Sequence, residues 1–254
     1  MILYAAAIWP EETIRYPKRL YSFGNGGTGI WRSIDRLLVA VDEKPRVLID
    51  SGAFTAWNSG KEISLEEYIE FIGETKSRYA SRLRSLNFIT LDVIGDQEKS
   101  WKNHERIIKH FPDVLPVVTR DATQKDIERA LEADYLAIGG MVGSGAKHYI
   151  QVFKTAIERF RKTGTMKRIH MLGVTNPERL LKYPAYSSDS TSYVAPGRFG
   201  RGLWTGGSIP RSSQFGERAK EIRNAEIRHY LRLFEKMERD HERIWCARGI
   251  CWEK

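Results

Sequence analysis

Cysteine is scarce in this chain of 254 residues. Only two residues are cysteines, Cys246 and Cys251, and both lie near the C-terminus. Disulfides form and persist in oxidising compartments and are rare in reducing ones. The low cysteine content therefore favours a reducing, cytoplasmic compartment.

Long hydrophobic runs are missing as well. No apolar segment reaches the ~20 residues that a membrane-spanning helix requires, so we expect no membrane partner. Residues 1–10 also lack the positively charged start of a signal peptide. Their apolar character instead predicts a first buried strand over residues 2–8.

Acidic residues are fewer than basic ones. The chain carries 41 Lys and Arg against 32 Asp and Glu, which gives a formal net charge of +9. Such an excess favours a polyanionic partner, because contacts with phosphates release counterions. A basic surface without a committed partner is the alternative.

The sequence also has no linker-like stretch, internal repeat or low-complexity tract, so we expect one domain over residues 1–254. Short apolar runs alternate with helical patterns, which is typical of βα units and a parallel sheet. The length suits a (β/α)8 barrel of the TIM type, which takes about 250 residues. The expected fold class is therefore α/β, and an open sheet is the alternative.

Seven apolar runs predict strands, and an eighth strand is expected around residues 203–205. The seven cover residues 2–8, 47–50, 88–92, 114–118, 135–139, 169–173 and a short run that ends at Asp189. Capping patterns predict helix starts at residues 64–67, 123–126 and 176–177. A charged helix over about residues 213–245 is expected to pack as a C-terminal extension. Its predicted buried stripe is Ile222, Ile227, Tyr230, Leu231 and Phe234.

Three carboxylates stand where apolar runs end, namely Asp50, Asp92 and Asp189. The carboxyl ends of parallel strands lie at one face of a barrel, where barrel enzymes carry their chemistry. Such a set can divide its work between a nucleophile, a group that exchanges protons and a group that accepts hydrogen bonds. Exchange at a sugar C1′ suits it, because a facing carboxylate stabilises an oxocarbenium-like transition state. The alternative is that each aspartate only caps the helix that follows.

Five short segments, in the same order, resemble elements of one enzyme family. They are residues 50–54 (Asp-Ser-Gly-Ala-Phe), Asp92, residues 137–142 (Ala-Ile-Gly-Gly-Met-Val), residues 170–180 and residues 189–193 (Asp-Ser-Thr-Ser-Tyr). The family comprises the tRNA-guanine transglycosylases and their relatives that put 7-deazaguanine bases into DNA. The resemblance covers roughly residues 47–202 and implies a barrel with base-exchange activity.

The resemblance implies a role for each aspartate. Asp189 would attack C1′ of a target guanosine, displace guanine and form a covalent glycosyl-enzyme. Asp50 would act as general acid and base on the departing and entering bases. Asp92 would accept hydrogen bonds from the N–H edge of the base. A free guanine or 7-deazaguanine would then attack the same carbon and restore the glycosidic bond.

Other substrate contacts follow from the same resemblance. Backbone groups of Gly139, Gly140 and Met141 would meet the O6 face of the base. Phe54 and Leu172 would sandwich its ring, with ordinary core packing as the alternative for both. Gly173 belongs to the same substrate-binding segment.

The chain departs from the family's tRNA enzymes in three ways. It has no Cys-x-Cys-x-x-Cys cluster with a later His, so we expect no structural zinc and no other cofactor. His241, Cys246 and Cys251 form a weak candidate set of metal ligands. The glutamine that reads the base is not evident, and no RNA-binding domain follows the barrel. These departures favour the shorter DNA-modifying branch that is typical of phages and mobile elements.

A segment rich in glycine, arginine and aromatic residues follows Asp189. Its arginines could contact phosphates and its tryptophan could stack on an exposed base. The candidate nucleic-acid contacts are Arg198, Arg201, Trp204 and Arg211. A glycine-rich loop that closes the barrel is the alternative.

Three weaker features complete the pattern. The glycine-rich residues 22–29 predict a flexible active-site loop, with a plain turn as the alternative. His104 and His110 are expected on a solvated helix face. His170 lies on an apolar strand, where a buried, hydrogen-bonded histidine is more common than a substrate contact.

The first hypothesis is thus a glycosyltransferase that replaces guanine in DNA with a 7-deazaguanine. A minimal tRNA-guanine transglycosylase that needs a partner subunit is the second. A barrel enzyme acting on a small phosphorylated metabolite is the third, and a catalytically inactive nucleic-acid-binding relative is the fourth.

Overall fold

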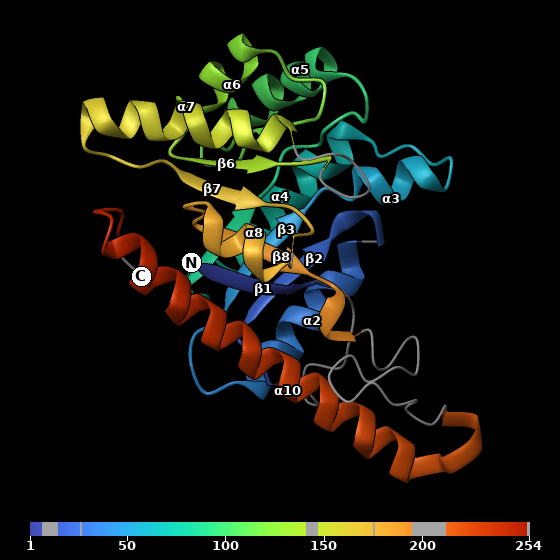
Figure 1. Ribbon diagram of the computed structural model, residues 1–254. Coiled ribbons are helices and arrows are strands. Elements are labelled where there is room, and N and C mark those ends of the chain that lie inside the picture. The colour runs from blue at the N-terminus through green and yellow to red at the C-terminus, as the bar shows by residue number, and fades with distance from the viewer. Residues whose placement is uncertain (7–14, 26, 141–146, 175, 195–211, 253–254) are drawn as a thin grey trace.

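The computed structural model describes residues 1–6, 15–25, 27–140, 147–174, 176–194 and 212–252. At its centre is an all-parallel sheet of eight strands in the order β4-β3-β2-β1-β8-β7-β6-β5 (Figure 1). The strands are β1 (Ile2–Ala6), β2 (Lys18–Ser22), β3 (Arg46–Asp50), β4 (Ser85–Phe88), β5 (Val117–Val118), β6 (Tyr135–Ile138), β7 (Arg168–Met171) and β8 (Ser187–Ser190). The first strand pairs with the last, so that Tyr4 lies beside Asp189.

The sheet is curled, and backbone hydrogen bonds link the chain just after β4 to the chain just before β5. Ile89, just after β4, forms a parallel bridge with Leu115, just before β5. The N–H of Leu115 donates to the carbonyl of Phe88 at 2.8 Å, and the N–H of Thr90 donates to the carbonyl of Leu115 at 2.9 Å. The fold is therefore α/β, with a curled, all-parallel eight-stranded sheet that is compatible with the expected TIM-like barrel.

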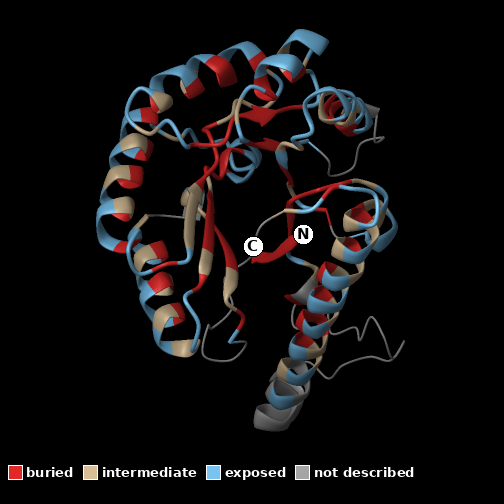
Figure 2. Ribbon diagram, turned by 90° about the vertical axis from the view of Figure 1, so that its left-hand side faces the viewer, coloured by how far each residue is buried: buried red, intermediate tan, exposed pale blue. Residues whose placement is uncertain are grey.

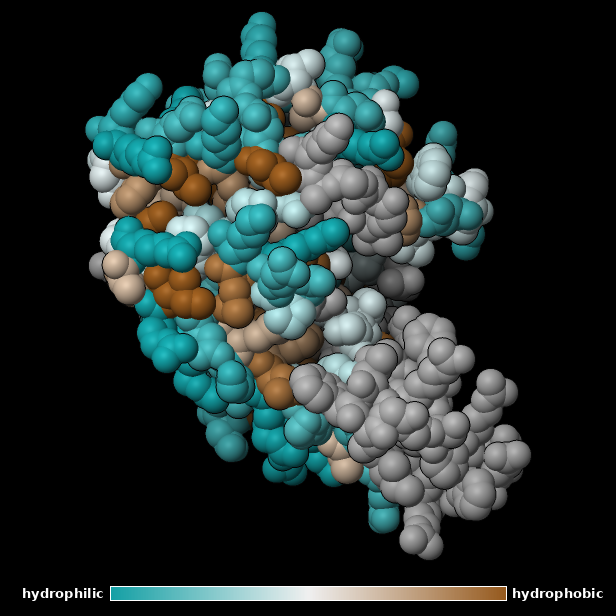
Figure 3. Space-filling model, in the orientation of Figure 1, coloured by the Kyte–Doolittle hydropathy of each residue, from teal (hydrophilic) through white to brown (hydrophobic). Residues whose placement is uncertain are grey.

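Helices cover the outside of the curled sheet and present their exposed faces to solvent (Figures 1 and 2). They are α2 (Gly27–Ala40), α3 (Ala53–Asn58), α4 (Leu65–Tyr79), α5 (Gln97–Ile108), α6 (Gln124–Ala130), α7 (Lys147–Thr163), α8 (Pro177–Lys182) and α10 (Ser212–Cys246), with the 3-10 turns η1 (Phe23–Asn25) and η2 (Ser192–Val194). Hydrophilic side chains cover most of the face in Figure 3, where hydrophobic ones form separate patches. Within the described ranges, no helix is both long and apolar enough to cross a membrane.

The strand predictions hold except at two places. Each of the seven predicted runs overlaps an observed strand, but β4 ends at Phe88, where the predicted run begins. The strand that the prediction missed is β2, and residues 203–205 lie outside the described residues. β2 has no apolar run, because Lys18 and Arg19 open it, yet Arg19 is fully buried. The long aliphatic stem of an arginine can pack like an apolar side chain.

The capping predictions are confirmed. The Oγ of Ser64 accepts a hydrogen bond from the N–H of Glu67 at the start of α4. Thr123 forms a complete capping box with residue 126 before α6. Asn176 caps α8, whose first residue is Pro177. Each cap satisfies a backbone N–H that a helix start otherwise leaves unpaired.

Apolar side chains pack on both faces of the sheet, because successive strand residues point to opposite faces. The inner cluster contains Ile2, Tyr4, Ala6, Leu20, Leu48, Ile89, Leu115, Val117, Tyr135, Ala137 and Tyr186. Two outer clusters join the helices to the opposite face of the strands. The curled sheet thus has a packed interior, with room for chemistry only near the strand ends.

The C-terminal helix α10 packs along β1 and α8 (Figure 1). Its predicted stripe is buried at Ile227, Tyr230, Leu231 and Phe234. The side chain of Ile222 lies outside the described residues. Glu238 on α10 accepts a hydrogen bond from the N–H of Leu3 at 2.7 Å, which ties the helix to β1.

The residues after α10 return to the end of the sheet where the strands begin (Figure 2). The ring of Trp252 lies 6.1 Å from that of Tyr186 and stacks on His241 at 6.0 Å. Trp252 also packs against the inner cluster. The described part of the C-terminal tail therefore packs against this end of the sheet.

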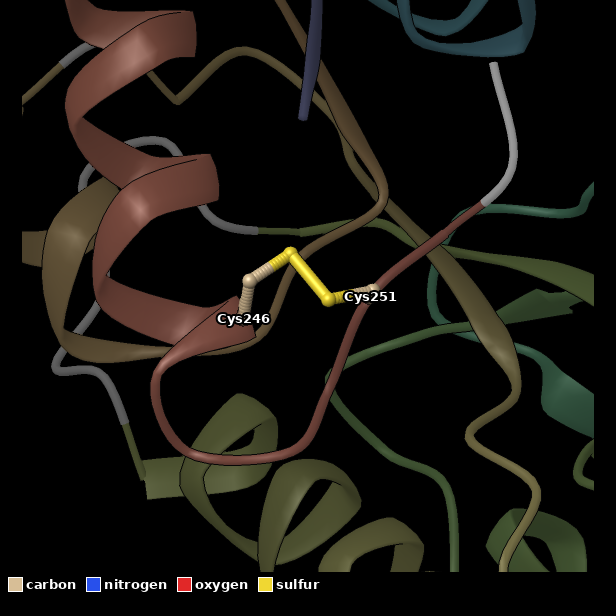
Figure 4. Close-up of a disulfide and its surroundings, with 2 residues drawn as sticks. All are labelled: Cys246 and Cys251. Carbon is tan, nitrogen blue, oxygen red and sulfur yellow. A yellow bond between two sulfur atoms is a disulfide. The ribbon is translucent and has the colours of Figure 1, made fainter.

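A disulfide joins Cys246 to Cys251 across a short turn (Figure 4). This differs from the free thiols that a reducing compartment implies. The two Cα atoms lie 4.7 Å apart, a proximity that the number of cysteines in the sequence does not reveal. Both sulfurs are used in the disulfide, so the candidate metal set with His241 offers no thiolate. The Nε2 of His241 instead bonds the carbonyl of Tyr183 at 3.0 Å.

Candidate active site

The three aspartates lie at the same end of the sheet. Asp50 is the last residue of β3, Asp189 is the third residue of β8, and Asp92 follows β4 by four residues. The carboxyl ends of all eight parallel strands point this way. The charges of Asp92 and Asp189 both act on Asp50, which places the three carboxylates within electrostatic reach of one another.

Asp50 is shifted toward its protonated form. Burial raises its pKa to about 7, and the neighbouring charges of Asp92 and Asp189 add to the rise. Hydrogen bonds from the backbone of Gly52 and Ser51 oppose it. A carboxyl group with a pKa near neutrality can both give and take a proton at working pH.

Asp92 lies beside Asp50 and is linked to the same turn. The hydroxyl of Ser51 donates to Oδ1 of Asp92 at 3.3 Å. Burial raises the pKa of Asp92 to about 6, although this hydrogen bond lowers it. Ser51, the residue directly after Asp50, thus ties Asp92 to the turn at the end of β3.

Asp189 is held through one of its two oxygens. The N–H of Gly173 donates to Oδ1 at 2.8 Å, and Nε2 of His170 lies 3.2 Å from the same atom. Asp189 itself is 7% exposed. Among the described residues, both hydrogen-bond contacts of this carboxylate are made to Oδ1. The two contacts orient the carboxylate through Oδ1.

A buried chain of polar groups supports Asp189 from below. The hydroxyl of Tyr135 lies 2.6 Å from Oγ of Ser187, which lies 2.6 Å from Nδ1 of His170. Because Nε2 of His170 faces a carboxylate, this nitrogen carries the proton in the neutral ring and Nδ1 accepts from Ser187. His170 is fully buried, and the ring of Tyr4 packs edge-on against it at 6.1 Å.

The turn after Asp50 requires glycine. Gly52 has φ of 80°, and a Cβ placed on it would lie 2.4 Å from the backbone nitrogen of Gly24. Its N–H donates to Oδ2 of Asp50 at 3.1 Å. Gly24 belongs to η1, directly after the strand that the sequence did not reveal. The predicted loop is corrected where the structure describes it: residues 22–25 end β2 and form η1, and residues 27–29 start α2. Gly24 packs against the turn that holds Asp50.

The glycines after β6 lie at the same end of the sheet. A Cβ on Gly139 would meet Val117 at 3.3 Å and Leu172 at 3.8 Å, so this position adjoins the inner cluster. The N–H of Gly139 donates to the carbonyl of Val118 at 2.9 Å and is therefore not available to a base. The carbonyl of Gly139 lies 2.8 Å from Nε2 of His148. Gly140 follows with φ of 68°.

Phe54 and Leu172 differ in their surroundings. Leu172 is partly buried and packs against the inner cluster. Phe54 is 54% exposed on α3, which excludes core packing for this side chain. Trp57, one helical turn later, is 60% exposed, and the two ring centroids lie 6.2 Å apart. Sequence reasoning missed Trp57, although its spacing from Phe54 places both on one side of a helix.

Gln97 is a second residue that sequence reasoning missed. Its Oε1 accepts from both the N–H and the hydroxyl of Thr119 at 2.8 Å, and its Nε2 donates to Val117 at 3.0 Å. It thereby fixes the end of β5. His104 is buried against Thr90 at 2.8 Å, so its predicted solvated position is wrong, whereas His110 is exposed as predicted.

Five predicted site residues lie outside the described residues. They are Met141, Arg198, Arg201, Trp204 and Arg211. In the described part of the chain, no group of three or more His, Cys, Asp or Glu side chains is arranged to hold a metal ion. The candidate site therefore consists of the three carboxylates, the chain of polar groups behind Asp189 and the exposed aromatic side chains of α3.

The chain matches no protein-family model, and no curated protein matches it either. What the site can do is therefore inferred from its own side chains.

Proposed function

We propose that this protein is a base-exchange glycosyltransferase that replaces guanine in DNA with a 7-deazaguanine. The observation that carries the proposal is the difference in environment between two neighbouring carboxyl groups. Asp50 has a pKa of about 7, while Asp189 is oriented through Oδ1 by two donors. One carboxyl is suited to proton transfer and the other to nucleophilic attack.

The first half of the reaction breaks the glycosidic bond. Oδ2 of Asp189 attacks C1′ of the target guanosine and forms an ester-like bond to the sugar, while the bond from C1′ to N9 breaks. The leaving guanine keeps that electron pair at N9 and takes a proton from Asp50. Positive charge that develops on the sugar is stabilised by the carboxylate that faces it.

The second half reverses these steps with another base. Asp50, now ionised, removes the N9 proton of the incoming 7-deazaguanine. N9 then attacks C1′, and Asp189 leaves as a carboxylate. The protonated Asp50 and the free Asp189 are regenerated, so atoms and protons balance over the cycle. No redox partner or cofactor is needed.

Asp92 is suited to hold the base during both halves. Its carboxylate is anchored through Oδ1 by Ser51 and lies on the Asp50 side of the site. A carboxylate that accepts from two adjacent N–H groups of guanine would select this base over adenine, which lacks that donor edge. Leu172 and Phe54 are proposed to pack on its ring, and Gly173 and the carbonyl of Gly139 to line its path.

The proposal includes the complete (β/α)8 barrel. The bridge between Ile89 and Leu115 supports a sheet that closes on itself, since it joins the two edge strands. It also includes a cytoplasmic location, where nucleic acid and free bases are at hand. DNA is preferred over tRNA because the chain carries no zinc cluster of the Cys-x-Cys-x-x-Cys type.

The deciding experiment incubates the purified protein with labelled guanine and either DNA or tRNA. Label that enters DNA alone supports the proposal, and label that enters tRNA alone supports a tRNA-guanine transglycosylase. Asp189→Ala is the control, because it should lose all incorporation. A folded wild-type protein that labels neither nucleic acid would contradict the proposal and favour a small phosphorylated substrate.

A further inference from the structure

Two aromatic side chains are exposed beside the candidate site. Of the described large apolar side chains, four are exposed, and Phe54 and Trp57 are the aromatic ones among them. Their rings are tilted by 31° and form one continuous surface on α3. Exposing such rings forgoes the stabilisation that burial would give, on the order of 2 kcal/mol for each side chain. An exposed pair next to a reactive site therefore indicates a binding surface.

A pocket of about 380 Å³ adjoins Trp57. The buried residues Ala56 and Leu91 contribute to its floor, and the exposed Lys61 and Lys99 to its rim. This volume lies within the range of about 300–1,000 Å³ that is typical of small-ligand pockets. The pocket thus offers an aromatic face, an apolar floor and two cations at its edge.

The pocket is joined to the carboxylate cluster but is distinct from its reacting centre. Asp92 lies on its wall, whereas neither Asp50 nor Asp189 is among its lining residues. A base undergoing exchange must lie within reach of both of those aspartates. The pocket therefore suits a second base, adjacent to the first.

Its chemistry matches one unstacked nucleobase. Every base has a π-face that can stack on an indole ring, whatever its sequence. Polar edges of a base could meet the carboxylate of Glu62, which lines the pocket, while Asp92 is left to the exchanged base. The ammonium groups of Lys61 and Lys99 could meet the flanking phosphates. Lys99 also lies 3.3 Å from Asp96, yet its side chain is 68% exposed.

We propose that Trp57 and this pocket bind the base of the nucleotide next to the one that is exchanged, in a single-stranded or locally opened DNA. The inference rests on the proposed function and adds a second subsite to it. It assigns Trp57 a role in holding the strand, so that the neighbouring guanosine reaches the aspartates already unstacked.

The test uses single-stranded DNA oligonucleotides with one guanosine and the fluorescent base 2-aminopurine beside it. Binding to the full-length protein is measured without any incoming base, so that no exchange is required. Trp57→Ala is expected to weaken binding about 5- to 100-fold and to remove the change in 2-aminopurine emission. Trp57→Phe keeps an aromatic face and should stay within about threefold of wild type.

Val39→Ala is the matched control, because Val39 is 88% exposed on α2 and its loss should change nothing. Circular dichroism checks that each variant is folded. Wild-type affinity in folded Trp57→Ala would overturn the inference. So would a Trp57→Ala variant that binds RNA oligonucleotides more weakly than wild type but binds DNA equally well. Exchange is assayed separately with the same variants. If Trp57→Ala weakens binding but the wild-type protein shows no exchange, the proposed reaction is refuted and the subsite is kept. If the wild-type protein shows exchange but Trp57→Ala binds normally, the subsite is refuted and the reaction is kept.

Discussion

Nε2 of His170 lies 3.2 Å from Oδ1 of Asp189 inside the curled sheet, where the histidine is fully buried and the aspartate is 7% exposed. Two strands, β7 and β8, bring these side chains together, and the hydroxyl of Ser187 holds the far side of the imidazole ring. The histidine therefore orients the carboxylate rather than touching the substrate. Its effect on the reaction should pass through Asp189.

Replacement of His170 tests this positioning role. His170→Leu removes the donor and should slow formation of the covalent intermediate by about 10- to 100-fold, the loss expected for one hydrogen bond to a charged group. The KM for the oligonucleotide should change little. His170→Gln keeps an N–H near the position of Nε2 and should recover most of the rate. Equal losses in both folded variants would point to packing instead, and single-turnover kinetics distinguish the outcomes.

Asp50 should impose opposite pH dependences on the two halves of the reaction. Its pKa of about 7 means that the acid form declines above neutrality. Release of guanine needs that acid form and should slow as pH rises through about 7, whereas capture of the second base needs the ionised form and should accelerate. Rapid-quench assays of each half follow both trends. Asp50→Asn should lose both dependences, and pH profiles identical to wild type would remove Asp50 from proton transfer.

The same titration affects folding. The folded-state pKa of Asp50, about 7, is raised above its ordinary value of 3.8, so its contribution to stability is complete below pH 3.8 and is lost as pH rises through 7. Asp50→Asn should therefore increase the free energy of unfolding at pH 8 by about 1–2 kcal/mol, after allowance for solvent screening, and give no gain at pH 4. Urea titrations at both pH values measure this. The exposed Asp42→Asn serves as control, and an Asp50→Asn gain that is larger at pH 4 would contradict the expectation.

Two glycines with positive φ provide a matched pair for the site's architecture. Gly52 has φ of 80° and no space for a Cβ, while Gly60 has φ of 65° and no atom within 4 Å of such a Cβ. Gly60→Ala should cost about 1 kcal/mol of unfolding free energy, from backbone conformation alone. Gly52→Ala should cost about 3 kcal/mol or more, because Gly24 must also move. Similar losses in the two variants would show that the contact between Gly24 and Gly52 contributes little.

The parts of the fold that the sequence predicts are those governed by local patterns. Apolar runs predict seven strands, and short polar caps such as Asn176 and Thr123 predict helix starts. β2 escapes this reasoning because Lys18 and Arg19 interrupt the apolar pattern. Only the sheet around it makes Arg19 a buried residue.

The sequence predicts those site residues that lie at the ends of strands. Asp50 and Asp189 end or interrupt apolar runs, so parallel pairing brings them to one face. His170 and Gln97 could not be assigned in this way, because their roles depend on partners 19 and 22 residues away in sequence. The exposure of Trp57 likewise depends on where α3 lies against the sheet. The disulfide of the C-terminal tail depends on a turn that the cysteine count does not reveal.

Mass spectrometry of Asp189 under exchange conditions tests the proposed chemistry most directly. The protein is mixed with a short guanosine-containing DNA without an incoming base, quenched in acid and digested. The expected result is a sugar-linked adduct on the peptide that contains Asp189, absent in Asp189→Asn and lost when 7-deazaguanine is added before the quench. Exchange at the wild-type rate in Asp189→Asn, or an adduct on another residue, would contradict the covalent role of Asp189.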